Sequence, residues 1–257
     1  MSSLNELEDM EKLRGLSWMV ALSQGLGITM VILMGVWLNT YMGGFAWDGS
    51  GKEFNLHPLC MICGMVFLYG EAALVYRVFR QTEKLKAKII HASLLLLAFI
   101  AIVVGLVAVF QFHHKMHITN MYSLHSWFGM ITVLLFCLQF LLGFLSFLLP
   151  GARPSIRSFY LPLHQFFGGG ILTLAVISVI SGINEKLFFK YKGTGYSKLP
   201  ASAVIANVCG LVTIGFVLTI LYIIQKKEWQ RKPASAEEEE SLAIHFQPIS
   251  GHGTDTE

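Results

Sequence analysis

NMYSLHSWFGMITVLLFCLQFLLGFLSFLL, residues 120–149, places a histidine, His125, at the start of a long apolar run. The run exceeds the about 20 helical residues that cross the hydrocarbon core of a bilayer. An ionisable side chain inside such a segment is costly, so it marks a candidate functional site. This stretch therefore predicts a membrane-spanning helix that carries a functional histidine near one end.

Composition extends this prediction to the whole chain. Hydrophobic residues make up 54% of the 257 residues, charged residues make up 14%, and the mean hydropathy is +0.59, which excludes an ordinary soluble domain. Backbone groups in lipid must pair with one another, so helices rather than open strands are expected. We predict an all-α integral membrane bundle of six transmembrane helices at residues 16–38, 57–79, 89–112, 125–149, 163–183 and 203–224.

Charged residues predict the orientation of the bundle. Thirteen of the 19 Lys and Arg residues fall on the side that holds both chain ends, and six fall on the other side. Cytoplasmic loops are enriched in Lys and Arg, so both termini are predicted to be cytosolic. The first apolar run is longer than a secretory h-region, and no cleavable signal peptide is expected. The predicted domains are a cytosolic N-terminal segment at 1–15, a six-helix domain at 16–232 and a disordered acidic cytosolic tail at 233–257.

Four histidines lie near the starts of four successive predicted spans: His57, His91, His125 and His164. Consecutive helices run in opposite directions, so their starts alternate between the two membrane faces. His57 and His125 are therefore expected on the non-cytosolic side, and His91 and His164 on the cytosolic side. Only histidines at similar depth can share a ligand, which predicts these two pairs.

Two facing imidazoles in the core of a helix bundle suit the iron of haem b. Zinc normally takes three or four protein ligands, and carboxylates are scarce in these spans. Two haems at two depths, on the order of 20 Å apart at the helical rise, would carry electrons across the membrane. A single intramembrane histidine could equally be a hydrogen-bonded packing residue or a proton relay.

Small residues and cysteines fit this interpretation without deciding it. Glycines on the four histidine-bearing spans would admit a flat macrocycle, and they are equally typical of ordinary membrane helix packing. They are Gly64, Gly70, Gly105, Gly129, Gly143 and Gly168 to Gly170. The four cysteines lie inside predicted helices, so we expect them to be buried and inert rather than disulfide-bonded.

Three segments, FNLHPLCMICGMVFLYGEAALVYRVFR (54–80), GLVAVFQFHH (105–114) and MYSLHSWFGM (121–130), resemble the cytochrome b561 family. The resemblance covers all six spans, and the four histidines are 34, 34 and 39 residues apart. GGFAWDG (43–49) and the acidic tail are most similar to the chromaffin-granule type of secretory vesicles, whereas SGINEKLFF (181–189) also resembles the lysosomal type.

The resemblance implies a dihaem, ascorbate-dependent transmembrane oxidoreductase. Cytosolic ascorbate would reduce the inner haem b, and the outer haem b would reduce monodehydroascorbate in the vesicle lumen. Luminal copper monooxygenases would consume the regenerated ascorbate, and homodimers are common in the family. The implied axial ligands are His57 and His125 for the luminal haem, and His91 and His164 for the cytosolic haem.

A cytosolic ascorbate site is expected from charge. Ascorbate is a monoanion, so its site should present Lys or Arg. Lys84 and Lys88 precede His91 by seven and three residues, and Arg157 precedes His164 by seven. The resemblance assigns these three residues to ascorbate, although the positive-inside rule alone would also place cations there. Arg77 lies at the cytosolic end of the second span and is expected to contact a haem propionate there.

A luminal acceptor pocket is implied by the resemblance at Phe112, His113 and Tyr122. Phe112 and Tyr122 could instead belong to the aromatic belt at the membrane interface. Glu185, at the luminal end of the fifth span, is a candidate contact for a haem propionate or its neighbours.

Other functions stay open at this point. A ferric-chelate reductase of the same family would differ only in the luminal acceptor. A quinol-linked dihaem cytochrome would need a lipid-facing quinone pocket. A non-haem, histidine-lined proton or metal transporter would want acidic partners, and Glu71 is the main acidic residue in the spans. Besides secretory vesicles, the membrane could be lysosomal or the plasma membrane.

Overall fold

The computed structural model describes residues 2–149, 151–192 and 195–231, and the predicted tail at 233–257 lies outside this part of the chain. Six helical spans in the described part are long and apolar enough to cross a membrane, which confirms the predicted all-α membrane bundle. They are Leu13–Tyr41, Gly51–Val78, Lys84–Lys115, Leu124–Leu148, Pro154–Tyr191 and Ala201–Gln225.

The helices extend beyond the predicted apolar runs. α5 (Lys84–Lys115) begins five residues before the predicted start at 89, and α7 (Pro154–Tyr191) begins nine residues before 163. α1 (Ser2–Val36) runs without a break across the predicted domain boundary between residues 15 and 16. Apolar composition marks only the part of a helix that lies in lipid, whereas backbone hydrogen bonding continues into the aqueous layer. The cations predicted near His91 and His164 are therefore carried on the same helices as the histidines.

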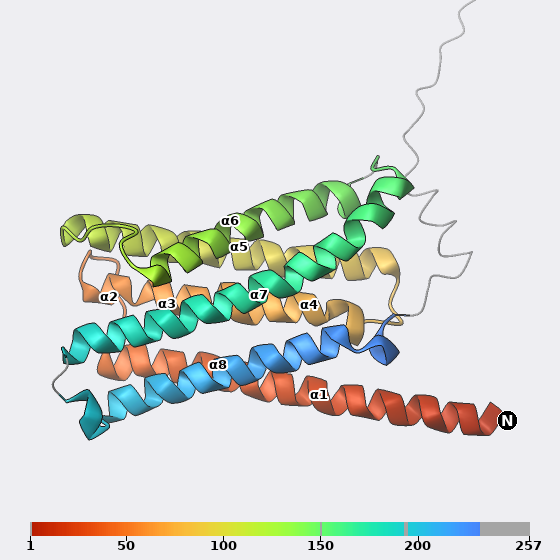
Figure 1. Cartoon of the computed structure of the whole chain (residues 1–257), viewed down its shortest axis with the longest axis horizontal. Helices are drawn as coiled ribbons and strands as arrows, with labels where there is room; N and C mark the ends of the chain where they lie inside the picture. The colour runs from red at the N-terminus through yellow and green to blue at the C-terminus, as the bar shows by residue number, and fades with distance from the viewer. Residues whose placement is uncertain (1, 150, 193–194, 232–257) are drawn as a thin grey trace, which may run out of the picture.

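The six spans run along one common axis (Figure 1). α1 packs beside α8 (Ala201–Gln225), and α6 (Leu124–Gly143) packs beside α7. α5 packs along the whole second span, which consists of α2 (Gly51–Phe54), α3 (Leu56–Cys60), the π-helix η2 (Met61–Leu68) and α4 (Tyr69–Val78). The four histidine-bearing spans thus form two antiparallel pairs, and α1 with α8 supports them from one side.

Short irregular helices complete the chain. Two further π-helices, η1 (Trp37–Tyr41) and η3 (Phe144–Leu148), end the first and fourth spans. Two 3-10 helices, η4 (Tyr196–Lys198) and η5 (Lys227–Trp229), flank α8.

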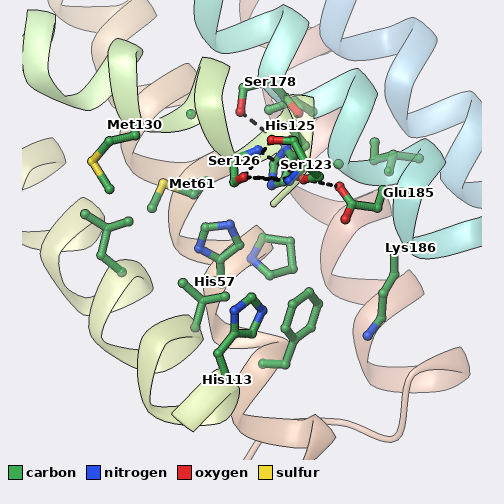
Figure 2. A pocket seen from close by; sticks show the side chains of 18 of the residues that line it. His57, Met61, His113, Ser123, His125, Ser126, Met130, Ser178, Glu185 and Lys186 are labelled. Atoms are coloured by element: carbon green, nitrogen blue, oxygen red, sulfur yellow. Dashed lines mark hydrogen bonds between the residues drawn. The ribbon is translucent and has the colours of Figure 1, made fainter. Parts of the chain in front are cut away.

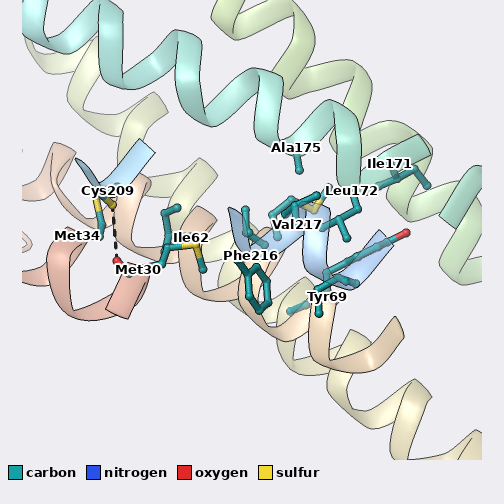
Figure 3. Close-up of a cluster of buried hydrophobic side chains, with 14 of the residues drawn as sticks. Met30, Met34, Ile62, Tyr69, Ile171, Leu172, Ala175, Cys209, Phe216 and Val217 are labelled. Atoms are coloured by element: carbon teal, nitrogen blue, oxygen red, sulfur yellow. Dashed lines mark hydrogen bonds between the residues drawn. The ribbon is translucent and has the colours of Figure 1, made fainter. Parts of the chain in front are cut away.

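A buried hydrophobic cluster joins α1 and α8 to the histidine-bearing helices (Figure 3). Phe216 of α8 is fully buried, and a Cβ at Gly70 of α4 would lie 2.8 Å from its ring, so glycine lets these two helices approach closely. The thiol of Cys209 lies 3.6 Å from the Met30 carbonyl of α1. Phe216 thus packs α8 against the second span, and Cys209 joins α8 to α1.

The cysteine prediction is right only in part. All four cysteines in the described residues are free thiols, as expected. Cys209 is buried, but Cys60, Cys63 and Cys137 are partly exposed. Each histidine-bearing helix has one side away from the core, and an apolar sequence does not distinguish that side from the buried one because lipid is as apolar as the core.

Candidate functional site

The structure brings the four predicted histidines together in two pairs. The ring centres of His57 on α3 and His125 on α6 lie 6.2 Å apart. The ring centres of His91 on α5 and His164 on α7 lie 6.3 Å apart. These are the pairs that the alternation of helix starts predicts.

Three of the four rings are oriented by the same kind of hydrogen bond, from Nδ1 to a backbone carbonyl of a neighbouring helix. The bonds join His57 to Gly105 (3.2 Å), His91 to Ala72 (2.7 Å) and His125 to Ser178 (2.8 Å). A carbonyl can only accept, so Nδ1 carries the proton in these rings and Nε2 keeps its lone pair. A hydrogen bond from the ring nitrogen that does not face the metal fixes the ring and raises the basicity of Nε2 as a ligand.

His125 and His164 are related by a reciprocal contact between α6 and α7. A Cβ at Gly182 of α7 would lie 2.6 Å from Cε1 of His125, and a Cβ at Gly143 of α6 would lie 2.9 Å from Cε1 of His164. On each helix the histidine and the glycine are 18 residues apart. Each of the two antiparallel helices therefore contributes a histidine ring at one level. At the other level it contributes a glycine against which the histidine ring of the other helix packs. Sequence reasoning included Gly143 but missed Gly182, for which the equal spacing of 18 was the available signal.

The second span and α5 repeat this reciprocal arrangement through hydrogen bonds. His57 bonds Gly105 at one level, and His91 bonds Ala72 at the other. The two levels are 14 residues apart on α5 but 15 on the second span. The π-helix η2 lies between the two levels of the second span, and a π-helix accommodates an extra residue. Fourteen residues of α-helix correspond to about 21 Å between the levels.

The spacing within each pair fits one iron between two imidazoles. A metal–imidazole bond is about 2 Å long and the ring centre lies about 1 Å behind the nitrogen, so two rings on opposite sides of one metal have centres about 6 Å apart. Across the described ranges, no three His, Cys, Asp or Glu side chains form a group able to hold a metal ion. Pairs without a third ligand suit bis-histidine haem better than zinc.

A cavity of about 480 Å³ opens beside the His57–His125 pair, within the size range of ligand sites (Figure 2). It brings together every residue predicted for the luminal side: His57, Phe112, His113, Tyr122, His125 and Glu185. Phe54 and Lys186 also line it and were missed by sequence reasoning. Phe54 stands one turn before His57, and its ring centre is 5.3 Å from that of Phe112 and 6.2 Å from that of His57.

Glu185 ties the loop before α6 to α7. Its carboxylate accepts hydrogen bonds from the Tyr122 hydroxyl (3.0 Å) and the Ser123 hydroxyl (2.9 Å). Burial and the bond to Glu185 raise the pKa of the Tyr122 phenol, which keeps it a neutral donor. His113 Nδ1 lies 2.9 Å from the Asn120 amide oxygen in the same loop. Both carboxylate oxygens of Glu185 are thus engaged with this loop, which gives the residue a structural task beside its predicted propionate contact.

At the other level, the predicted cations converge. Lys84 and Lys88 lie on α5 and Arg157 lies on α7, and the charges of Lys84 and Arg157 both act on the Lys88 ammonium. Cations from two helices thus lie close enough for their charges to interact. This is the arrangement expected for an anion site next to His91 and His164.

Further side chains surround the His91–His164 pair that sequence reasoning did not identify. The rings of Tyr76, Phe147 and Tyr160 have centres 5.3–5.7 Å from those of the two histidines. Tyr76 stands in the ALVYR segment beside Arg77, which was the only sequence signal for it. The Arg77 guanidinium donates to the Ile224 carbonyl at the end of α8, so Arg77 also joins two helices.

A family model described as eukaryotic cytochrome b561 matches residues 56–190, which contain all four histidines. The transmembrane ascorbate-dependent reductase CYB561 of Sus scrofa is 48% identical over 235 residues, covering 91% of this chain and 92% of the relative. The lysosomal membrane ascorbate-dependent ferrireductase CYB561A3 of Mus musculus is 48% identical over 224 residues, covering 86% and 93%. The corresponding protein of Danio rerio is 50% identical over 213 residues, covering 80% and 86%.

A cytochrome b carries haem b, and the geometry of the paired histidines fits that cofactor. The family model spans more than half of the chain, and the Sus scrofa relative is aligned with 91% of it. The chain belongs to the eukaryotic cytochrome b561 family.

Proposed function

We propose that the protein is an ascorbate-dependent transmembrane reductase that holds two haem b groups and transfers single electrons from cytosolic ascorbate to an acceptor in the lumen of a vesicle. One observation carries the proposal most strongly. Two inter-helix histidine pairs with the same spacing of 6.2–6.3 Å are stacked at two levels of one bundle. An enzyme acting at one membrane face would need only one such level.

Haem b, when bound at each level, supplies a reversible one-electron carrier. The chain's own task is to hold and orient it. His57 and His125 would be the axial ligands of the luminal haem, and His91 and His164 those of the cytosolic haem. The Nδ1 bonds of His57, His91 and His125 to backbone carbonyls prevent rotation of these three rings. The glycines at 143 and 182 leave room for the rings of His164 and His125.

The donor site would consist of Lys84, Lys88 and Arg157. Ascorbate carries one negative charge near neutral pH, and Lys or Arg can give it charge-assisted hydrogen bonds. The convergence of the three cations from α5 and α7 supports this role. Arg77, at the same end of the bundle, would contact a propionate of the cytosolic haem while it bonds to α8.

The acceptor site would be the cavity lined by Phe112, His113 and Tyr122. Monodehydroascorbate is the acceptor that we favour, because its reduction would regenerate ascorbate for luminal copper monooxygenases. Relatives named ferrireductases favour a ferric chelate as the second candidate at the same cavity. The electron path through the two haems and the cytosolic donor site would be the same for both acceptors.

The proposal extends to the orientation, the membrane and the assembly of the protein. Both termini would be cytosolic, with the 1–15 segment and the 233–257 tail on that side and the six-helix domain of 16–232 between them. A secretory vesicle of the chromaffin type is the proposed membrane, and a lysosomal membrane is the alternative that the lysosomal relatives support. A homodimer is proposed from the family resemblance alone.

The test is haem content combined with an optical difference spectrum of the purified protein before and after ascorbate. Two haems per chain, reduced at least in part by ascorbate, are expected. A protein that is folded but binds no haem would refute the proposal and favour a histidine-lined transporter. One haem per chain would refute electron transfer through two haems at two levels of the bundle.

A further inference from the structure

The luminal cavity contains one cationic side chain that the proposed function does not use. Among its lining residues in the described chain, Lys186 is the only Lys or Arg. It follows Glu185 near the end of α7, and Figure 2 shows it beside the cavity. The other lining side chains are mostly apolar or aromatic.

The charge of Lys186 is held in place without being neutralised. Its Nζ lies 3.8 Å from the centre of the Phe54 ring, a cation–π contact. The neighbouring carboxylate, Glu185, is engaged by Tyr122 and Ser123. Within the part of the chain that the structure describes, no carboxylate forms an ion pair with Lys186. A cation on an aromatic face keeps its capacity to bind an anion.

The next lysine on the same helix has a different role. Lys190, one turn further, donates to the Tyr41 carbonyl (2.8 Å) and the Ser202 hydroxyl (3.1 Å), and so fastens the end of α7 to the first and sixth spans. Lys190 does not line the main cavity, although both lysines border a shallower hollow beside it. Lys186 therefore lines both the cavity and the hollow beside it.

We infer that Lys186 binds the negative charge of the electron acceptor in the luminal cavity, which selects small anions there. This inference rests on the proposed function and specifies its substrate class: an enolate or carboxylate anion such as the monodehydroascorbate radical or a ferric carboxylate chelate. The radical anion takes one electron, which comes from cytosolic ascorbate, and one proton from water to become ascorbate. Apolar walls strengthen the attraction because they lower the local dielectric.

The carboxylate of a haem propionate is an alternative anionic partner for Lys186. The position of Lys186 where the cavity meets the neighbouring hollow favours a soluble anion, and the experiment separates the two. The variants are Lys186→Gln, which removes the charge, and Lys186→Arg, which keeps it. The matched control is Lys198→Gln, which removes one exposed luminal charge outside the cavity.

The measurement uses vesicles loaded with ascorbate, to which either ferricyanide, an anion, or hexaammineruthenium(III), a cation, is added outside. Lys186→Gln should slow reduction of the anion about tenfold relative to the cation, as expected for one lost charge-assisted hydrogen bond. Lys186→Arg and Lys198→Gln should keep the wild-type ratio. High salt should shrink the difference.

Two results would overturn the inference. An unchanged anion-to-cation ratio in Lys186→Gln would show that its charge does not act on the acceptor. An altered haem content or spectrum with unchanged acceptor rates would assign the charge to a propionate instead. Failure of the proposed function is distinguishable, because the wild-type protein itself would then bind no haem or transfer no electrons to either acceptor.

Discussion

Replacing Gly182 by alanine tests how the bundle holds His125. The added Cβ would lie 2.6 Å from Cε1 and 2.8 Å from Nδ1 of the ring, about 0.8 Å inside the 3.4 Å at which ordinary contact begins. The ring cannot swing away without losing its 2.8 Å bond to the Ser178 carbonyl. Overpacking of this kind costs about 1–3 kcal/mol. We therefore expect Gly182→Ala to displace His125 and release the luminal haem.

The same helix offers a matched control. A Cβ at Gly170 of α7 would meet nothing within 4 Å. Alanine in a helix interior is favoured over glycine by about 1 kcal/mol, so Gly170→Ala should be neutral or stabilising. Gly143→Ala, whose Cβ would lie 2.9 Å from Cε1 of His164, should affect the other level instead.

Haem per chain and the reduced-minus-oxidised spectrum of each purified variant measure these effects. Gly182→Ala should fall from two haems towards one, and the remaining haem should still be reduced by ascorbate. Gly143→Ala should lose the ascorbate-reducible haem first, and Gly170→Ala should keep both. Two haems with a wild-type spectrum in Gly182→Ala would refute the reasoning that this ring has no room to move.

The other predictions concern the two substrate faces. His91→Ala should leave about one haem per chain and abolish oxidation of cytosolic ascorbate; retained ascorbate oxidation would contradict its role as a ligand. Lys88→Gln combined with Arg157→Gln should raise the KM for ascorbate about a hundredfold or more while both haems stay bound, since each of the two lost charged hydrogen bonds is worth about 1.5–3 kcal/mol. Normal ascorbate kinetics in that double variant would remove the donor site. Glu185→Gln should raise the KM for the luminal acceptor several-fold, because the bond that positions Tyr122 weakens; loss of haem instead would point to a propionate contact.

The six spans and the two histidine levels were predictable from the sequence because the thickness of the lipid bilayer constrains them. A bilayer of fixed thickness sets the length of each apolar run, and alternation of direction then sets the depth of each histidine. His57, His91, His125 and His164 stand near helix starts, so their grouping required no knowledge of packing. The helix ends were less predictable, because α5 and α7 continue into the aqueous layer where composition no longer marks them.

Parts of the site depended on contacts between helices that are distant in the sequence. The bed that Gly182 provides for His125 and the two bonds of Glu185 to the loop before α6 arise between separate helices. The second span has one residue more than α5 between the two histidine levels, and η2 accommodates it; only the pairing of these two spans reveals this difference. In the sequence, Lys186 is only one of the six cations on the non-cytosolic side; its contact with the Phe54 ring is a feature of the tertiary structure.

The membrane class, the number of spans, the depth of the four histidines and the family can all be read from the amino-acid sequence. Tertiary packing sets which side of each helix faces which neighbour. It brings Arg77 to the end of α8, buries Cys209 but not Cys63, and places Lys186 at the cavity beside His57 and His125. The physical reason is that lipid and protein core are equally apolar. Hydropathy therefore encodes the depth of a residue but carries little information about rotation around the helix axis, which close packing and hydrogen bonds determine.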